Sequence, residues 1–183
     1  MGYGFSFHME DCIGCQACVV ACAKKNKFFY GFRKLDKHER DVHGENAVLY
    51  LSTSCHHCEN PECMRMCPEQ LYYKRRDGVV MQKIGQCKGC LTCVKSCPYG
   101  APKFNHRIGK VNKCNLCVDE NNGSFQPKCV AACPTNALRL IKSEQFEQDS
   151  KLQEFDLGNI GKSYLTQPSF QVTMSDKMRK KYE

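Results

Sequence analysis

The sequence predicts an α+β fold of short strands, short helices and tight cysteine loops, and three observations support this prediction. Sixteen of the 183 residues are cysteines, which fall into four groups of four with none left over. Proline follows the last cysteine of three groups, where its missing N–H prevents a helix from continuing. Short apolar runs bounded by turn residues lie between the groups and are typical of strands.

The cysteine groups repeat one spacing along the chain. The first, CIGCQACVVAC at residues 12–22, has gaps of two, two and three residues between its cysteines. The second, CHHCENPECMRMC at residues 55–67, has gaps of two, four and three, and the third, CKGCLTCVKSC at residues 87–97, returns to two, two and three. The fourth, at residues 114–133, has gaps of two, eleven and three. Because only the middle gap varies, the groups form an internal repeat whose insertions are confined to one loop.

Strand signals follow the prolines. The pair Asp77-Gly78 predicts a hairpin turn between strands at residues 71–74 and 79–82. The run CPTNALRLI, which begins at residue 133, starts in the same way and predicts a further short strand. Together with the cysteine loops, these elements predict an α+β, ferredoxin-like layout.

The spacing within the groups suits a cubane iron-sulfur cluster. One tight loop with thiolates three residues apart reaches three irons of the cube, and the fourth iron needs a ligand from elsewhere in the chain. In bacterial two-cluster ferredoxins, the run C-x₂-C-x₂-C-x₃-C-P gives its fourth cysteine to the other cluster. The first and third groups match that spacing, although Ala23 follows Cys22 where the pattern has proline.

Structural zinc and disulfides are the alternative explanations. Zinc takes four tetrahedral ligands, usually from two separated C-x₂-C pairs. Taken by themselves, the second and fourth groups fit this pattern, and His56 and His57 could serve as further ligands. A three-cysteine loop with a fourth cysteine four residues on is not a zinc pattern. Disulfide domains are typically shorter and exported, and no export signal precedes Cys12. Iron-sulfur ligation is the stronger interpretation, and a zinc-stapled interaction module is the remote alternative.

Residues beside the cysteines are expected to support a cluster. With four cysteines already in their group, His56 and His57 are expected to hydrogen-bond sulfur or backbone. Gly14 and Gly89 lie inside tight loops, where the absence of Cβ lets backbone N–H groups approach a cluster. No nucleophile-base constellation, Walker loop or dinucleotide fingerprint is visible, so no catalytic residue is predicted.

The positive charge of the chain is distributed among the cysteines. The formal net charge is +8, which in isolation suggests a nucleic-acid or membrane-surface partner. However, four lysines lie within or directly beside cysteine motifs, at Lys88, Lys95, Lys113 and Lys128. Sixteen thiolates on four [4Fe-4S]²⁺ cores would bring the formal sum to zero. We therefore interpret the basic residues as compensation for thiolate charge, with no nucleic-acid partner.

The order of the groups, their gaps and the runs CHHCENPECMRMCP and CPYGAPKFN resemble the electron-transfer subunit of the dimethyl sulfoxide reductase family of molybdenum enzymes. The resemblance covers about residues 3–142 and extends weakly to YLTQPSFQV. It implies a non-catalytic subunit that carries four [4Fe-4S] clusters in anaerobic respiration. The implied partners are a molybdopterin-containing catalytic subunit and a membrane anchor or quinol-oxidising subunit. The same modules recur in subunits of hydrogenases, formate dehydrogenases and carbon monoxide dehydrogenases, which remain the alternative.

The resemblance also implies the ligands of each cluster. Three cysteines come from one group and the fourth from another. The sets are Cys12, Cys15, Cys18 and Cys133 for cluster 1; Cys22, Cys114, Cys117 and Cys129 for cluster 2; Cys55, Cys58, Cys63 and Cys97 for cluster 3; and Cys67, Cys87, Cys90 and Cys93 for cluster 4.

Two nested ferredoxin-like modules follow from this crossed ligation. An outer module of residues 1–47 and 104–142 would hold the first and fourth groups, and an inner module of residues 48–103 would hold the second and third. The basic and aromatic insertion at residues 24–34 is expected to cover the core or contact a subunit, and an irregular tail at residues 143–183 is expected to dock on a partner. No apolar run approaches the roughly 18 residues that span a bilayer. We therefore expect a peripheral subunit of a membrane-associated prokaryotic complex, without a signal peptide of its own.

Overall fold

A short helix follows the second cysteine of every group and has the third cysteine as its second residue. In the computed structural model, which describes residues 2–27, 31–42, 45–120, 125–146 and 163–175, these helices are α1 (Ala17–Asn26), α2 (Glu62–Arg65), α3 (Thr92–Ser96) and α4 (Lys128–Ala131). The longer middle gaps place Pro61 and Pro127 just before α2 and α4, where the fixed φ of proline suits a helix start. The shorter gaps use left-handed residues there, Gln16 before α1 and Leu91 before α3.

A three-stranded sheet joins the two ends of the chain. Its central strand β1 (Tyr3–His8) pairs antiparallel with β8 (Leu138–Lys142) and parallel with β9 (Phe170–Thr173). Because β1 is central, Phe5 and Phe7 are both almost completely buried. The strand predicted after residue 133 is confirmed as β8, and its partner β1 lies more than a hundred residues earlier.

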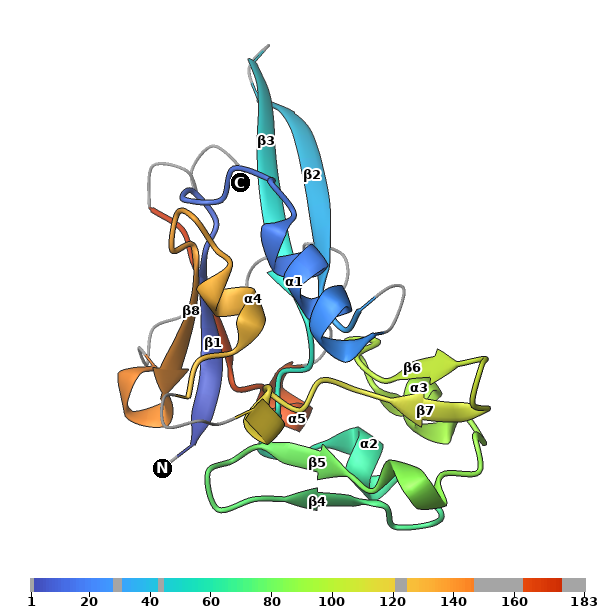
Figure 1. Ribbon diagram of the computed structural model, residues 1–183. Coiled ribbons are helices and arrows are strands. Elements are labelled where there is room, and N and C mark those ends of the chain that lie inside the picture. Colours follow the sequence, from blue (N-terminus) through green and yellow to red (C-terminus); the bar gives the residue numbers. More distant parts are fainter. Residues whose placement is uncertain (1, 28–30, 43–44, 121–124, 147–162, 176–183) are drawn as a thin grey trace.

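The long hairpin of β2 (Lys34–Val42) and β3 (Glu45–Thr53) lies between the first two cysteine groups. Figure 1 shows that it projects from the rest of the molecule, with α1 near its base. At that base Leu49, Leu51 and Ser52 are buried, and the first two join a core that also contains Cys18 and Cys129.

Two short hairpins follow the second and third groups. The predicted hairpin is confirmed as β4 (Tyr72–Lys74) and β5 (Val80–Gln82), with Gly78 in the turn at a φ of +77°. A second hairpin, β6 (Lys103–Asn105) and β7 (Lys110–Asn112), had no equivalent signal in the sequence. Single 3₁₀ turns follow β5, β7 and β8, at Ile84–Gln86, Val118–Glu120 and Ser143–Gln145.

The helices pack in pairs, α1 against α4 and α2 against α3. Figure 1 shows α4 beside the sheet that contains β1 and β8, and α2 and α3 among the two short hairpins. Each pair therefore brings the first and fourth groups, or the second and third groups, to one place. None of the helices in the described part of the chain is long and apolar enough to cross a bilayer.

The described part of the C-terminal tail packs on the chain itself. Helix α5 (Ser163–Thr166) leads into β9, and the segment between them contacts the loop of the second cysteine group. The backbone N–H of Glu59 donates to Gln167 at 2.8 Å, and the N–H of Ser169 donates to the carbonyl of His56 at 2.9 Å. Residues 147–162 and 176–183 of the expected docking tail lie outside the described residues.

Candidate metal centres

The thiols of the first and fourth cysteine groups interact in two mixed sets. The pKa of Cys12 is raised by burial and by the charges of Cys18, Cys133 and Cys15. This is the combination that was predicted for cluster 1, with Cys133 joining from the far end of the repeat.

The second mixed set in this half of the molecule surrounds Cys22. Burial raises the pKa of Cys22, and the charge of Cys129 raises it further. The pKa of Cys114 is raised by burial and by neighbours that include both of these thiols, and the pKa of Cys117 is likewise raised by burial and by their charges. The four cysteines predicted for cluster 2 therefore influence one another, and their joint ligation of one cluster stays a prediction.

The remaining eight cysteines also gather in two mixed sets. Burial raises the pKa of Cys63, as do the charges of three further thiols, Cys55, Cys97 and Cys58. The pKa of Cys93 is raised by burial and by the charges of Cys67, Cys87 and Cys90. All four cysteines of the first of these sets line one cavity. All sixteen cysteines of the chain are free thiols.

The four sets lie in a continuous series. Cys18 of the first set and Cys129 of the second pack in one core. Among the thiol charges that raise the pKa of Cys114 in the second set, that of Cys55 in the third set acts most strongly. Cys63 of the third set packs with the buried Cys93 of the fourth. Exposed thiols occur only at the two ends of the series, at Cys15 and Cys90.

One backbone feature recurs in all four groups. The residue before the second cysteine has a positive φ: +72° at Gly14, +46° at His57, +69° at Gly89 and +58° at Leu116. This conformation turns its N–H toward the sulfur of the first cysteine, and the Gly89 and Leu116 N–H groups each reach that sulfur at 3.4 Å. The sequence indicated the two glycines, but histidine and leucine carry no such signal because they rarely adopt this conformation.

A second recurrent turn follows each Cys-Pro pair. The third residue after the last cysteine has a positive φ at Gln70, Gly100 and Asn136. The N–H of each donates back to the carbonyl of that cysteine, at 3.0, 3.1 and 3.4 Å respectively. The turn reverses the chain immediately after the proline.

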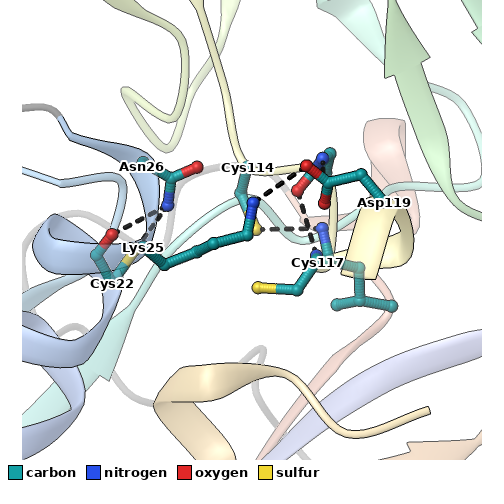
Figure 2. A network of polar contacts seen from close by, with 8 residues as sticks. Cys22, Lys25, Asn26, Cys114, Cys117 and Asp119 are labelled. Carbon is teal, nitrogen blue, oxygen red and sulfur yellow. Dashed lines mark hydrogen bonds and ion pairs between the residues drawn. The ribbon is translucent and has the colours of Figure 1, made fainter. Parts of the chain in front are cut away.

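Further N–H groups point at cysteine sulfurs from outside the tight loops. Phe32 donates to Cys22 Sγ at 3.3 Å, and Val111 donates to Cys87 Sγ at 3.4 Å. Figure 2 shows Cys22, Cys114 and Cys117 of the second set from close by, with the side-chain amide of Asn26 bonded to the carbonyl of Cys22. The amide nitrogen of Asn26 also lies 3.6 Å from Cys22 Sγ. Hydrogen bonds to sulfur stabilise thiolate charge and are a main influence on cluster potential.

An ion pair joins two segments of the second set. Lys25 of α1 contacts Asp119 at 2.8 Å, next to the loop that carries Cys117 (Figure 2). The charge of Lys25 lowers the pKa of Cys117, although burial keeps that pKa raised overall. The pair therefore fixes α1 against the fourth cysteine group and places a cation beside its thiol.

The two histidines of the second group are buried and neutral. Burial lowers the pKa of His56 to about 3, with Arg33 and Lys34 adding to the effect. Its ring contacts those of Phe170 and Tyr99, with centroid distances of 4.5 and 4.2 Å. Neither ring nitrogen has a hydrogen-bond partner among the described residues, so the hydrogen bond expected of His56 is not found, and aromatic packing holds the ring instead. His57 accepts a hydrogen bond from the N–H of Val80 at its Nδ1, at 3.1 Å, which agrees with the backbone contact expected of it.

Buried residues beyond the cysteines complete the surroundings of the third set. Lys113 donates to the carbonyls of Val80 and Cys114 and lies 3.6 Å from Cys55 Sγ. Thr166 of α5 lowers the pKa of Cys58 through its side chain, although burial raises that pKa to about 12. The sequence indicated Lys113 by its place beside a cysteine motif, but Thr166 lies too far along the chain for any spacing rule to find it.

The donor set of these sites fits iron-sulfur clusters. Buried thiols with raised pKa values become thiolates only when a metal or cluster supplies positive charge. Within the described residues, no group of three or more His, Cys, Asp and Glu side chains converges on a single ion. The four thiolates of a cluster lie farther apart than four thiolates that all bind one zinc ion, because Zn–S bonds are only about 2.3 Å long.

Comparison with known proteins identifies the same chemistry. Two family models described as 4Fe-4S dicluster domain match residues 11–71 and 46–143. The chain is 37% identical over 146 residues to the B subunit of anaerobic dimethyl sulfoxide reductase from Escherichia coli (strain K12), covering 74% of this chain and 71% of that protein.

Two further relatives serve other reductases. The chain is 37% identical over 143 residues to the thiosulfate reductase electron transfer subunit PhsB of Salmonella typhi, covering 75% of this chain and 74% of that protein. It is 36% identical over 147 residues to the B subunit of polysulfide reductase from Wolinella succinogenes, covering 74% of each. The substrates in these names differ, although the similarity covers a comparable share of each protein.

Proposed function

This protein belongs to the 4Fe-4S dicluster family of iron-sulfur subunits that serve the dimethyl sulfoxide, thiosulfate and polysulfide reductases, and from this premise we propose that it holds four [4Fe-4S] clusters and exchanges electrons with a molybdopterin catalytic subunit. It is a non-catalytic electron-transfer subunit. The expected relationship to the dimethyl sulfoxide reductase family is confirmed.

The observation that carries the four-cluster proposal is the mixing of the thiols into four sets. Thiols that influence one another include, for each set, three cysteines of one group and the last cysteine of another, which supports the crossed ligation that we propose. Clusters 1 to 4 would be held by the four sets in the order given by the sequence. The packing of α1 on α4, and of α2 on α3, supports the outer module of residues 1–47 and 104–142 and the inner module of residues 48–103.

The protein controls where electrons enter and leave. When bound, each cluster accepts and releases one electron at a time. The chain's own residues bury the middle of the series, donate N–H groups to sulfur and leave only Cys15 and Cys90 exposed at its ends. One end would face the catalytic subunit and the other a membrane anchor or quinol-oxidising subunit. The complex would be a membrane-associated respiratory reductase of a prokaryote, with this chain as its peripheral subunit.

Purification of the chain with its native partner tests this function. The complex should contain molybdenum or tungsten, and its dithionite-reduced clusters should be reoxidised when an S-oxide, thiosulfate or polysulfide is added. The isolated chain, reduced in the same way, should stay reduced with each of these compounds because it has no catalytic site. A nickel-containing partner would contradict the proposal. So would reoxidation of the isolated chain by these compounds at the rate seen for the complex.

A further inference from the structure

Arg33 is a buried cation at the base of the β2–β3 hairpin, with only 2% of its surface exposed. Its Nη1 donates to the carbonyl and hydroxyl oxygens of Ser52 at 3.3 and 3.0 Å, and its Nη2 donates to the hydroxyl of Ser54 at 2.9 Å. Its guanidinium carbon lies 4.5 Å from the centroid of the Phe5 ring. These contacts fix the position of the guanidinium group but supply no negative charge.

The negative charge that Arg33 faces comes from the first two cysteine sets. Phe32, the residue before Arg33, donates its backbone N–H to Cys22 Sγ of the second set at 3.3 Å. The buried guanidinium group itself interacts with Cys129 and Cys114 of the second set and with Cys18 of the first. Ser52, which accepts hydrogen bonds from Arg33, also lies 3.5 Å from Cys18 Sγ. The guanidinium group therefore lies between two predicted clusters.

A cation in this position favours the reduced form of a cluster. Arginine keeps its proton inside proteins, so its charge is the same in both redox states. A cluster that accepts an electron becomes more negative by one charge, and a fixed positive charge nearby stabilises that state more than the oxidised one. The effect is strong here because the site is buried and water screens little of the interaction.

We propose that Arg33 is the shared counter-charge of clusters 1 and 2 and raises the reduction potential of both. The proposal rests on the four-cluster function stated above. The side chain acts on the clusters through its charge, and the residues around it, Ser52, Ser54 and Phe5, keep that charge in place.

Lys113 supplies the matched comparison, because it is a second buried cation that lies beside the third set. Its Nζ lies 3.6 Å from Cys55 Sγ, and its charge lowers the pKa of Cys63. Both cysteines belong to the third set. Removing the charge of Lys113 should therefore act first on cluster 3, so the two buried cations should affect different clusters.

The test is a redox titration of the holoprotein followed by electron paramagnetic resonance, with iron and sulfide measured first in every sample. In Arg33→Gln, which keeps a hydrogen-bond donor but loses the charge, two of the four midpoint potentials should fall. We expect a shift on the order of 59 mV, which is about a tenfold change in the one-electron equilibrium constant. Arg33→Lys, which keeps the charge, should retain potentials close to those of the unmodified chain. Lys113→Gln should lower a potential that Arg33→Gln leaves unchanged.

Each outcome bears on one proposal or the other. Full iron content with all four potentials unchanged in Arg33→Gln would overturn the role of Arg33 and leave the four-cluster function standing. The same conclusion would follow if Arg33→Lys behaved like Arg33→Gln. Loss of clusters 1 and 2 from Arg33→Gln but not from Arg33→Lys would support the role, because Arg33→Lys keeps the positive charge and Arg33→Gln does not. An unmodified chain without four clusters would contradict the function itself.

Discussion

At the scale of single residues, we expect the last cysteine of each group to be needed for a cluster that is held mainly by another group. Cys67 is the last cysteine of the second group, yet its charge acts on Cys93 together with those of Cys87 and Cys90. An interpretation of the sequence as four independent sites would assign Cys67 to its own group. The crossed arrangement makes the opposite prediction.

Replacement of Cys67 by serine tests that arrangement. Cys67→Ser should damage cluster 4 and remove up to about four of roughly sixteen iron atoms, while the neighbouring cluster 3 stays comparatively intact. The matched variant Cys58→Ser should damage cluster 3 instead. Iron analysis and the paramagnetic resonance signals of the reduced protein report the two losses separately. Loss of cluster 3 from Cys67→Ser, with cluster 4 retained, would refute crossed ligation.

Gly89 shows the backbone demand of a tight loop. Its φ is +69°, and a Cβ placed on it would lie 2.3 Å from the carbonyl oxygen of Gly109. Gly89→Ala should therefore cost on the order of 1–3 kcal/mol and move the N–H that reaches Cys87 Sγ. Gly85→Ala is the control, because nothing lies within 4 Å of the added Cβ. Thermal unfolding of the two holoproteins measures the loss of stability in each. A loss in Gly89→Ala no larger than that in Gly85→Ala would contradict the backbone demand at Gly89.

Single residues also show where inference from sequence stops. The glycines of the tight loops could be recognised because glycine favours a positive φ. His57 and Leu116 adopt the same conformation only because the surrounding structure imposes it. Arg33 belonged to a basic and aromatic run for which a core-covering role was only one expectation, and its burial between two cysteine sets depends on contacts with Cys18 and Cys129 that local sequence does not encode.

At the scale of elements, the C-terminal segment acts as a brace for the third cysteine set. Phe170 of β9 is 2% exposed, pairs with β1 and lies 4.5 Å from the ring of His56. Thr166 of α5 hydrogen-bonds with Tyr99 at 2.5 Å. The described part of the tail packs against a site within its own chain, and docking of the tail on a partner stays a prediction.

Truncation of Phe170 tests this role. Phe170→Ala should cost roughly 3–5 kcal/mol because it removes a buried aromatic ring from both the sheet and the histidine. Leu165→Ala, at a side chain that is 51% exposed, should stay within about 0.5 kcal/mol. Unfolding experiments on the holoproteins measure both values. In Phe170→Ala the signal of cluster 3 should be lost first on warming, and simultaneous loss of all four signals would count against a local brace.

The elements that could be predicted are those with local causes. The β4–β5 hairpin followed from its Asp-Gly turn, and β8 followed from its apolar run after a Cys-Pro pair. The pairing of β1 with β8 and β9 could not be predicted, because it joins segments more than a hundred residues apart. The described residues that continue the expected insertion form the long β2–β3 hairpin, which no turn signal in the sequence indicated.

At the scale of the whole molecule, bound clusters take the place of a large apolar core. The mean hydropathy is −0.53, and much of what is buried is cysteine. The formal charge of +8 is distributed among the thiols, and Arg33 and Lys113 bring two cations into the interior. Removal of the clusters should therefore leave buried cations without counter-charge and a chain that cannot stay folded.

The most direct test of this account is the iron and acid-labile sulfide content of anaerobically purified protein, measured together with its visible absorbance. Four [4Fe-4S] clusters predict about sixteen iron and sixteen sulfide per chain, in a brown protein that dithionite bleaches. Zinc should be absent. A colourless protein that contains zinc and no sulfide would contradict the account.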